Sequence, residues 1–238
     1  MWLALDTATD RASIAIRPVG AQPLIDTISG ARRQAALLLP ALDALLQRAG
    51  TTLDHLEGIA VSDGPGSFTG LRVGASVAKA LAHARGVPLW TAPSLMVRAA
   101  GVAEPGSLVL AFSNALRGEV YAAAYRFYAD RIATELPASV RTVDKLVDTD
   151  FEPDFVVGEA PPEIVTPLEN WSGRPVITGA EALPQAVRLF DLIGRPGGAK
   201  LIEVPRTWEP HYGRPAEAQA RWEMAHGRPL PDSVGSPR

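Results

Sequence analysis

Residues 63–74 read Asp63-Gly64-Pro65-Gly66-Ser67-Phe68-Thr69-Gly70-Leu71-Arg72-Val73-Gly74. This stretch follows an apolar run at 58–62, which predicts a buried strand, and leads into an Ala/Val/Leu-rich pattern at 71–84, which predicts a helix. A strand, a glycine-rich turn and a helix in this order bring backbone N–H groups to the positive end of the helix. The loop therefore suits a bound anion, and it equally suits a sharp strand-to-helix corner that holds no ligand.

The loop differs from the common phosphate-binding loops. A Walker A loop carries Lys-Ser or Lys-Thr after its last glycine, whereas Leu71-Arg72 stands here. The dinucleotide-binding pattern fits only loosely, and the first strand, where such a fold carries it, ends on Asp6 instead. The glycines allow positive φ angles or a close backbone approach under either interpretation.

The N-terminal residues indicate the topology. An apolar run at 2–6 ends on Asp6, and two further strand-like runs follow at 12–16 and 24–28. Three strands, a helix, a strand and a helix is an order that resembles the actin-like ATPase (ribonuclease H-like) fold. In that fold an Asp at the end of the first strand serves a metal–phosphate group. We therefore expect an α/β protein of two small domains, each with a mixed sheet flanked by helices.

Several motifs make this resemblance more specific. They are Leu5-Asp6-Thr7-Ala8-Thr9, Leu38-Leu39-Pro40, the block at 64–74, Arg117-Gly118-Glu119-Val120-Tyr121 and Pro210-His211-Tyr212-Gly213-Arg214. In order and spacing they are similar to those of the bacterial TsaB (YeaZ) family, accessory proteins in making threonylcarbamoyladenosine on tRNA. Two positions depart from the family pattern. Gln34 stands where a His is common, and residues 113–116 read Ser-Asn-Ala-Leu where the family usually has an Asp.

The resemblance implies a non-catalytic accessory subunit that binds and activates a TsaD-type catalytic subunit, alongside a TsaE-type ATPase. It also implies a homodimer when the chain is alone, and contact with tRNA only through the complex. No catalytic residue, metal site or intrinsic cofactor is expected, and ATP or ADP with Mg²⁺ is expected only in complex with the partner. The vestigial nucleotide or anion site would comprise Asp6, Thr7, Thr9, Gly64, Gly66, Ser67, Thr69, Gly70 and Arg72.

Two helical patterns, at 31–49 and 71–84, are apolar on more than the single stripe that a surface helix needs. They could be enclosed within this fold, or they could pack on another protein, and the family resemblance favours the second interpretation. Pro40 is expected to kink the first helix or to start it anew. The predicted partner surface comprises Leu38, Leu42, Leu45, Val73, Ala75, Val77 and Leu81.

The composition limits what the protein binds. The 238 residues carry a formal net charge of −3 without a basic stripe, so we expect the chain not to hold tRNA alone. The absence of Cys excludes disulfides, thiolate nucleophiles and Cys-based zinc sites. The four His lack the paired spacing of a helical metal motif. We find neither a leader pattern nor a membrane-spanning run, and we expect a cytoplasmic protein.

We expect four regions along the chain. They are an N-terminal actin-like domain at 1–104, a smaller α/β domain at 105–205, a C-terminal segment at 206–226 and a disordered tail at 227–238. Within the second domain we expect strands at 107–112, 119–127 and 155–158, and a helix at 181–192.

Two other functions stay open on the sequence. An active small-molecule kinase or ATPase of the same fold would need a second carboxylate as base and an adenosine-contacting glycine motif in the second domain, and neither is evident. A peptidase would need a nucleophile–base pair or a metal site. The run at 66–70 places Ser67 one position away from that of a nucleophile elbow.

Overall fold

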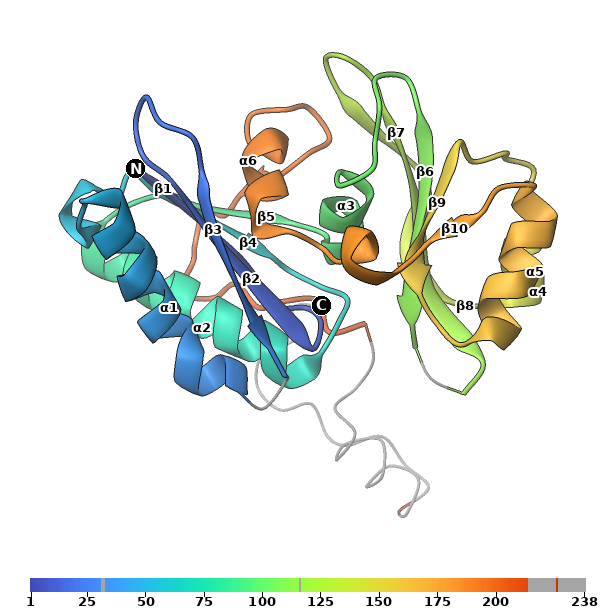
Figure 1. The fold of residues 1–238 in the computed structure, drawn as a ribbon, viewed down its shortest axis with the longest axis horizontal. Coiled ribbons are helices and arrows are strands. Elements are labelled where there is room, and N and C mark those ends of the chain that lie inside the picture. The colour runs from blue at the N-terminus through green and yellow to red at the C-terminus, as the bar shows by residue number, and fades with distance from the viewer. Residues whose placement is uncertain (31–32, 116, 214–225, 227–238) are drawn as a thin grey trace.

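The computed structural model describes residues 1–30, 33–115, 117–213 and 226 (Figure 1). The first half of the chain contains β1 (Trp2–Asp6), β2 (Arg11–Arg17), β3 (Leu24–Ser29), α1 (Gln34–Ala49), the 3₁₀ turn η2 (Leu53–His55), β4 (Gly58–Ser62), α2 (Phe68–Arg85), β5 (Leu89–Ala92) and α3 (Ser94–Ala99). The second half contains β6 (Leu108–Asn114), β7 (Glu119–Phe127), β8 (Ile132–Thr142), α4 (Val143–Val147), β9 (Phe155–Glu159), α5 (Pro162–Ser172), β10 (Val176–Ile177), the 3₁₀ turns η3 (Gly179–Ala182) and η4 (Ala186–Arg188), α6 (Leu189–Leu192) and β11 (Lys200–Leu201).

The two halves repeat one topology. In the first sheet β3, β2 and β1 are antiparallel neighbours, and β4 and β5 continue the sheet parallel to β1. In the second sheet β8, β7 and β6 are antiparallel neighbours, and β9 and β10 continue the sheet parallel to β6. Each half thus has a mixed sheet flanked by helices, which confirms the predicted fold class.

The helices form layers around the two sheets. Figure 1 shows α1 and α2 on the outer face of the first sheet, α4 and α5 on the outer face of the second, and α3 and α6 between the sheets. A separate apolar core lies under each outer helix pair, and a third core joins both sheets through α3 and α6. Because this third core contains residues of both halves, the geometry between the two sheets is set by close packing.

The second half of the chain returns to the first sheet at its end. β11 pairs with β5 at the edge of the first sheet, although residues 200–201 fall within the predicted second domain at 105–205. The Ala186 N–H donates to Ser13 Oγ on β2 at 3.0 Å. The predicted tail at 227–238 lies outside the described residues, as does the segment at 206–226 beyond residue 213, apart from residue 226.

One sequence-based expectation about helices is wrong, and a second keeps only one of its two alternatives. The helix expected at 181–192 is replaced by η3, η4 and the short α6, because Pro184 follows Leu183, whose backbone is extended. Pro40 does not start a new helix, since it lies inside the continuous α1, and the kink at Pro40 stays a prediction. In the part of the chain that the structure describes, no helix combines the length and hydropathy needed to cross a membrane.

Candidate functional site

A cleft of about 1080 Å³ opens between the two halves. Its first wall is formed by the turn after β1, the loop before α2, and α3. Its second wall is formed by the turn between β6 and β7 and by the end of β9. The charged side chains that line it are Asp10, Arg98, Arg117, Glu119 and Glu159. The volume lies just above the range of small-molecule sites, which is about 300–1,000 Å³.

Asp6 ends β1, just before the cleft-lining turn at 8–10, and is completely buried rather than part of the cleft lining. Its Oδ1 accepts the Ala8 N–H at 3.1 Å, whereas its Oδ2 has no hydrogen-bond partner among the described residues. Burial raises the pKa of the Asp6 carboxyl to about 6, against the opposing effects of the Ser62 hydroxyl, the Ala8 N–H and the Arg98 charge. The Ser62 hydroxyl lies near without meeting hydrogen-bond geometry. At a given pH, the Asp6 carboxyl is therefore protonated to a greater extent in the folded chain than an aspartate in water would be.

This raised pKa gives a stability prediction. The unfolded carboxyl ionises near pH 3.8 and the folded one near pH 6. The stability that protonated Asp6 contributes is thus present below pH 4 and lost as the pH rises through 6. Relative to wild type, Asp6→Asn should gain about 2 kcal/mol of unfolding free energy between pH 4 and pH 7. Urea denaturation across this range measures it, with Asp150→Asn at an exposed position as control. A pH-independent difference would contradict the assignment.

Three backbone N–H groups of the glycine-rich region donate to acceptors within the protein. The Gly64 N–H donates to Ser94 Oγ at 3.0 Å, and the Gly70 N–H donates to Ser67 Oγ, the N-cap of α2, at 3.2 Å. The Ser67 N–H donates to the Ala8 carbonyl at 2.7 Å. The Gly64 and Ser67 donors therefore join the loop to α3 and to the turn after β1, and the Gly70 donor is part of the N-cap of α2.

Close packing explains three glycines of this region. A Cβ on Gly66 would overlap the Ala8 carbonyl, a Cβ on Gly70 would overlap the Thr7 carbonyl, and a Cβ on Gly74 would overlap Thr7 Oγ1. The turn after β1 thus lies directly against the loop and the first turns of α2. Of the two interpretations that the sequence left open, this packing favours the corner, because it requires the glycines without any ligand.

Other residues of the predicted vestigial site have structural contacts. Thr7 is completely buried, and Thr9 Oγ1 donates to the Arg11 carbonyl at 2.8 Å. Thr69 is exposed on α2. Arg72 is not among the residues lining the cleft, because its guanidinium stacks over the Phe68 ring at 4.1 Å. Whether this set binds a nucleotide or an anion stays a prediction.

Gln34 is one of the two departures from the family pattern that the sequence indicated. It is buried at the start of α1, and its Nε2 donates to the Thr9 carbonyl at 2.7 Å. The amide therefore ties α1 to the turn after β1. Within residues 1–30, 33–115, 117–213 and 226, no three His, Asp or Glu side chains gather as a metal site would require.

Sequence reasoning missed Arg98, the most deeply buried cation of the cleft. It is 3% exposed on α3, and its Nη1 donates to the Ala182 carbonyl at 2.6 Å. Its Nη2 lies 3.9 Å from Glu159 Oε2. Burial lowers the pKa of this guanidinium, while the charges of Glu159 and Asp6 raise it. A lone Arg inside the apolar run at 94–99 was the available signal.

The residues predicted as a partner surface divide into two groups. Leu38, Leu42 and Leu45 are at most 2% exposed and lie in the core between α1 and the first sheet. Ala75 is also buried, at 5%. In contrast, Val73, Val77 and Leu81 are half-buried at the edge of the same core. We call these three α2 residues the docking face, because a partner could reach them while the leucines stay inside.

Comparisons with known proteins complete the description of the site. The family model described as "TsaD: tRNA N6-adenosine threonylcarbamoyltransferase" matches residues 28–164, more than half of the chain. The "tRNA threonylcarbamoyladenosine biosynthesis protein TsaB" of Haemophilus influenzae is 36% identical over 121 residues, which cover 50% of this chain and 51% of that protein. The Escherichia coli protein of the same name is 35% identical over 126 residues, 52% of this chain and 54% of that protein. The chain thus spans about half the length of these curated relatives.

A solved structure matches over a greater length. It is described as "Crystal structure of an uncharacterized protein with similarity to peptidase YEAZ from Pseudomonas aeruginosa", and it is 27% identical with a TM-score of 0.73. The match covers 90% of this chain and 99% of that chain. The family model covers more than half of the chain, and the chain therefore belongs to the TsaD-type family, in which it is similar to the TsaB (YeaZ) proteins.

Proposed function

We propose that this chain is an accessory subunit in tRNA threonylcarbamoyladenosine biosynthesis, and that it binds and activates a TsaD-type catalytic subunit without chemistry of its own. The observation that carries the proposal is the internal use of the glycine-rich loop. Its N–H groups at Gly64, Ser67 and Gly70 already have acceptors, and its glycine faces are packed against Thr7 and Ala8. A loop arranged this way supports a corner of the fold better than a phosphate.

The proposed route of action is association through α2. Val73, Val77 and Leu81 form an apolar strip that is only half-buried, so a partner packed on it would remove further apolar surface from water. The names of the relatives support a TsaD-type protein as the partner. The same proposal includes a homodimer of the free chain and a TsaE-type ATPase as a further partner. It also includes contact with tRNA only within the complex, and a cytoplasmic location. Binding of ATP or ADP with Mg²⁺ only in the assembled complex belongs to it as well.

The second candidate is an active kinase or ATPase, which the size of the cleft favours.

The two candidates differ in what the isolated chain does with Mg-ATP. We expect no steady-state hydrolysis above the buffer rate, because the Gly64, Ser67 and Gly70 N–H groups of the loop already have acceptors. Phosphate release by the purified chain measures this, with Asp6→Asn as the matched variant. Hydrolysis by wild type that Asp6→Asn removes would support the kinase or ATPase instead.

A further inference from the structure

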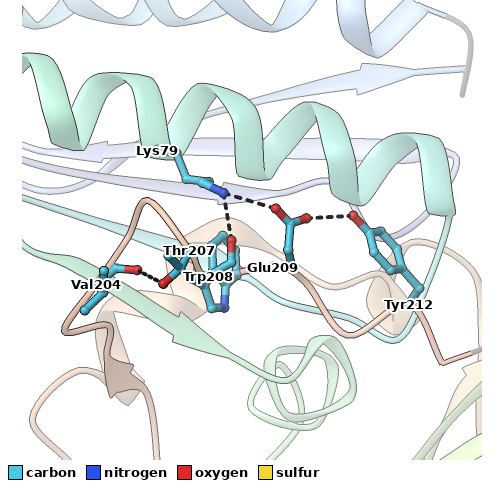
Figure 2. A network of polar contacts seen from close by, with 6 residues as sticks. All are labelled: Lys79, Val204, Thr207, Trp208, Glu209 and Tyr212. Atoms are coloured by element: carbon cyan, nitrogen blue, oxygen red, sulfur yellow. Dashed lines mark hydrogen bonds and ion pairs between the residues drawn. The ribbon is translucent and has the colours of Figure 1, made fainter. Parts of the chain in front are cut away.

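The described end of the chain forms a strap along α2. We define the strap as residues 204–213, which follow β11. Figure 2 shows Lys79 of α2 pointing at this segment, with its ammonium between Trp208 and Glu209. Lys79 Nζ donates to the Trp208 carbonyl at 2.7 Å and to Glu209 Oε1 at 3.2 Å. The Trp208 ring packs against the edge of the core under α2. The strap is thus joined to the middle of the helix by both polar and apolar contacts.

An aromatic contact joins the strap to the first turn of α2. The Tyr212 and Phe68 rings lie 4.6 Å apart between centroids. Arg72 lies over both rings, 4.1 Å from the centre of Phe68 and 5.8 Å from that of Tyr212. The Tyr212 hydroxyl donates to Glu209 Oε2 at 3.3 Å, so Glu209 links Lys79 to Tyr212 (Figure 2). Such cation–ring and ring–ring contacts add to the apolar burial.

The far end of the strap reaches the cleft. The His211 N–H donates to the Asp63 carbonyl at 2.7 Å, and the His211 carbonyl lies against Gly64, where a Cβ would overlap it. A Cβ on Gly213 would lie 2.6 Å from the Tyr121 ring and 2.9 Å from Pro65. Pro65 and Tyr121 both line the cleft, from its opposite walls. The strap is therefore held at three places: α2, the loop and the mouth of the cleft.

The inner face of α2 explains why the helix needs an outer contact. Except for Leu71, the residues it buries are small, namely Gly70, Gly74, Ala75, Ala78 and Ala82. Helices are fixed in position when large side chains interlock with the surface below. Glycine and alanine bring the backbones close but offer few such side chains. The strap supplies the missing lateral contacts through Trp208, Glu209 and Tyr212.

The strap lies on the side of α2 away from the docking face. At 3.6 residues per turn, Lys79 is about 160° around the helix from Val77, and Phe68 is about 140° from Val73. A partner on the docking face would therefore not contact Lys79 or the Phe68–Tyr212 pair. Any effect of these residues on association must act through the position of α2.

We propose that the strap fixes α2 in the position that makes its docking face competent, so that Lys79, Phe68 and Tyr212 are positioning residues for partner association. This inference rests on the proposed function.

Lys79→Met keeps the apolar stem of the side chain and removes both hydrogen bonds, and Tyr212→Ala removes the ring contact. Each should weaken binding of the TsaD-type catalytic subunit from the same organism about tenfold. Lys79→Arg should restore most of the affinity, because a guanidinium reaches the same acceptors.

The matched control is Arg85→Met, on the same helix. Arg85 pairs with Asp54 at 2.8 Å and has no part in the strap. Isothermal titration gives the affinity of each variant, and hydrogen exchange on the isolated chain gives the protection of α2 amides at 70–84. Lys79→Met and Tyr212→Ala should raise the amide hydrogen-exchange rates of α2 more than those of α1. Arg85→Met should not produce this difference between the two helices.

The outcomes separate this inference from the proposed function. If the wild-type chain does not bind the catalytic subunit, the proposed function fails. The hydrogen-exchange result then tests the strap by itself: unchanged exchange of the α2 amides in the strap variants would contradict its role in fixing α2. If wild type binds and the folded strap variants bind equally well, the strap inference is wrong while the function stands. Should Lys79→Met or Tyr212→Ala fail to fold, Glu209→Gln at an exposed side chain gives the same test in milder form.

Discussion

Replacing Val77 by Glu is expected to weaken association with the catalytic partner, and with a second copy of the chain, by about 100-fold or more. Val77 is half-buried on the docking face of α2. In the free chain a carboxylate there can turn toward water, so the variant should fold. In a complex the same carboxylate would be desolvated without a partner, which costs a few kcal/mol, roughly 2–7.

Ala75→Glu provides the contrast for this experiment. Ala75 is two positions away but 5% exposed, so Glu at that site should unfold the helix rather than disturb a surface. Ala129→Glu, in the exposed turn after β7, adds the same charge away from α2 and serves as control. Size-exclusion chromatography with light scattering, alongside circular dichroism, distinguishes the three. A folded Val77→Glu that assembles like wild type would show that the docking face lies elsewhere.

Gly70→Ala is expected to lower the unfolding free energy by about 3 kcal/mol. Alanine in place of glycine inside a helix ordinarily stabilises it by about 1 kcal/mol, so the sign is informative. At Gly70 the added Cβ would overlap the Thr7 carbonyl, which belongs to the backbone following the central strand β1. The backbone of the turn after β1 cannot move away without displacing the first sheet. The steric strain should therefore lower the unfolding free energy.

Urea denaturation of Gly70→Ala measures this strain. Ser76→Ala, at an exposed position of the same helix, is the control and should change stability by less than about 0.5 kcal/mol. Gly70→Ala with wild-type stability would mean that the turn after β1 does not press on α2. The structural explanation of the glycine-rich loop would then be lost, and an anion would again be needed to account for it.

Local signals in the sequence predicted the part of the fold that carries the glycine-rich loop. The strand at 58–62 and the strand at 119–127 have the bounds that the apolar runs indicated. Both are dense in apolar residues and end at turn residues, so the local pattern suffices. The helix at 181–192 failed because its apolar pattern was weighed above Pro184, which interrupts helical hydrogen bonding.

The candidate site depends on contacts that no local pattern contains. Helical spacing identified the stripe of Leu38, Leu42 and Leu45, but spacing does not tell whether a stripe faces the chain's own sheet or a partner. Arg98 acquires its place only when Ala182 and Glu159, from the second half of the chain, meet α3. Lys79 meets the strap across a separation of 129 residues. Such long-range pairs are visible only in the folded chain.

The most direct measurement is formation of threonylcarbamoyladenosine on tRNA by the purified TsaD-type catalytic subunit, supplied with a threonylcarbamoyl donor, the TsaE-type ATPase and Mg-ATP, with and without this chain. The account predicts modified tRNA only when wild-type chain is present, none from this chain alone, and a loss of the stimulation with the folded Val77→Glu variant. Equal modification of tRNA by the catalytic subunit with and without the chain would contradict the account.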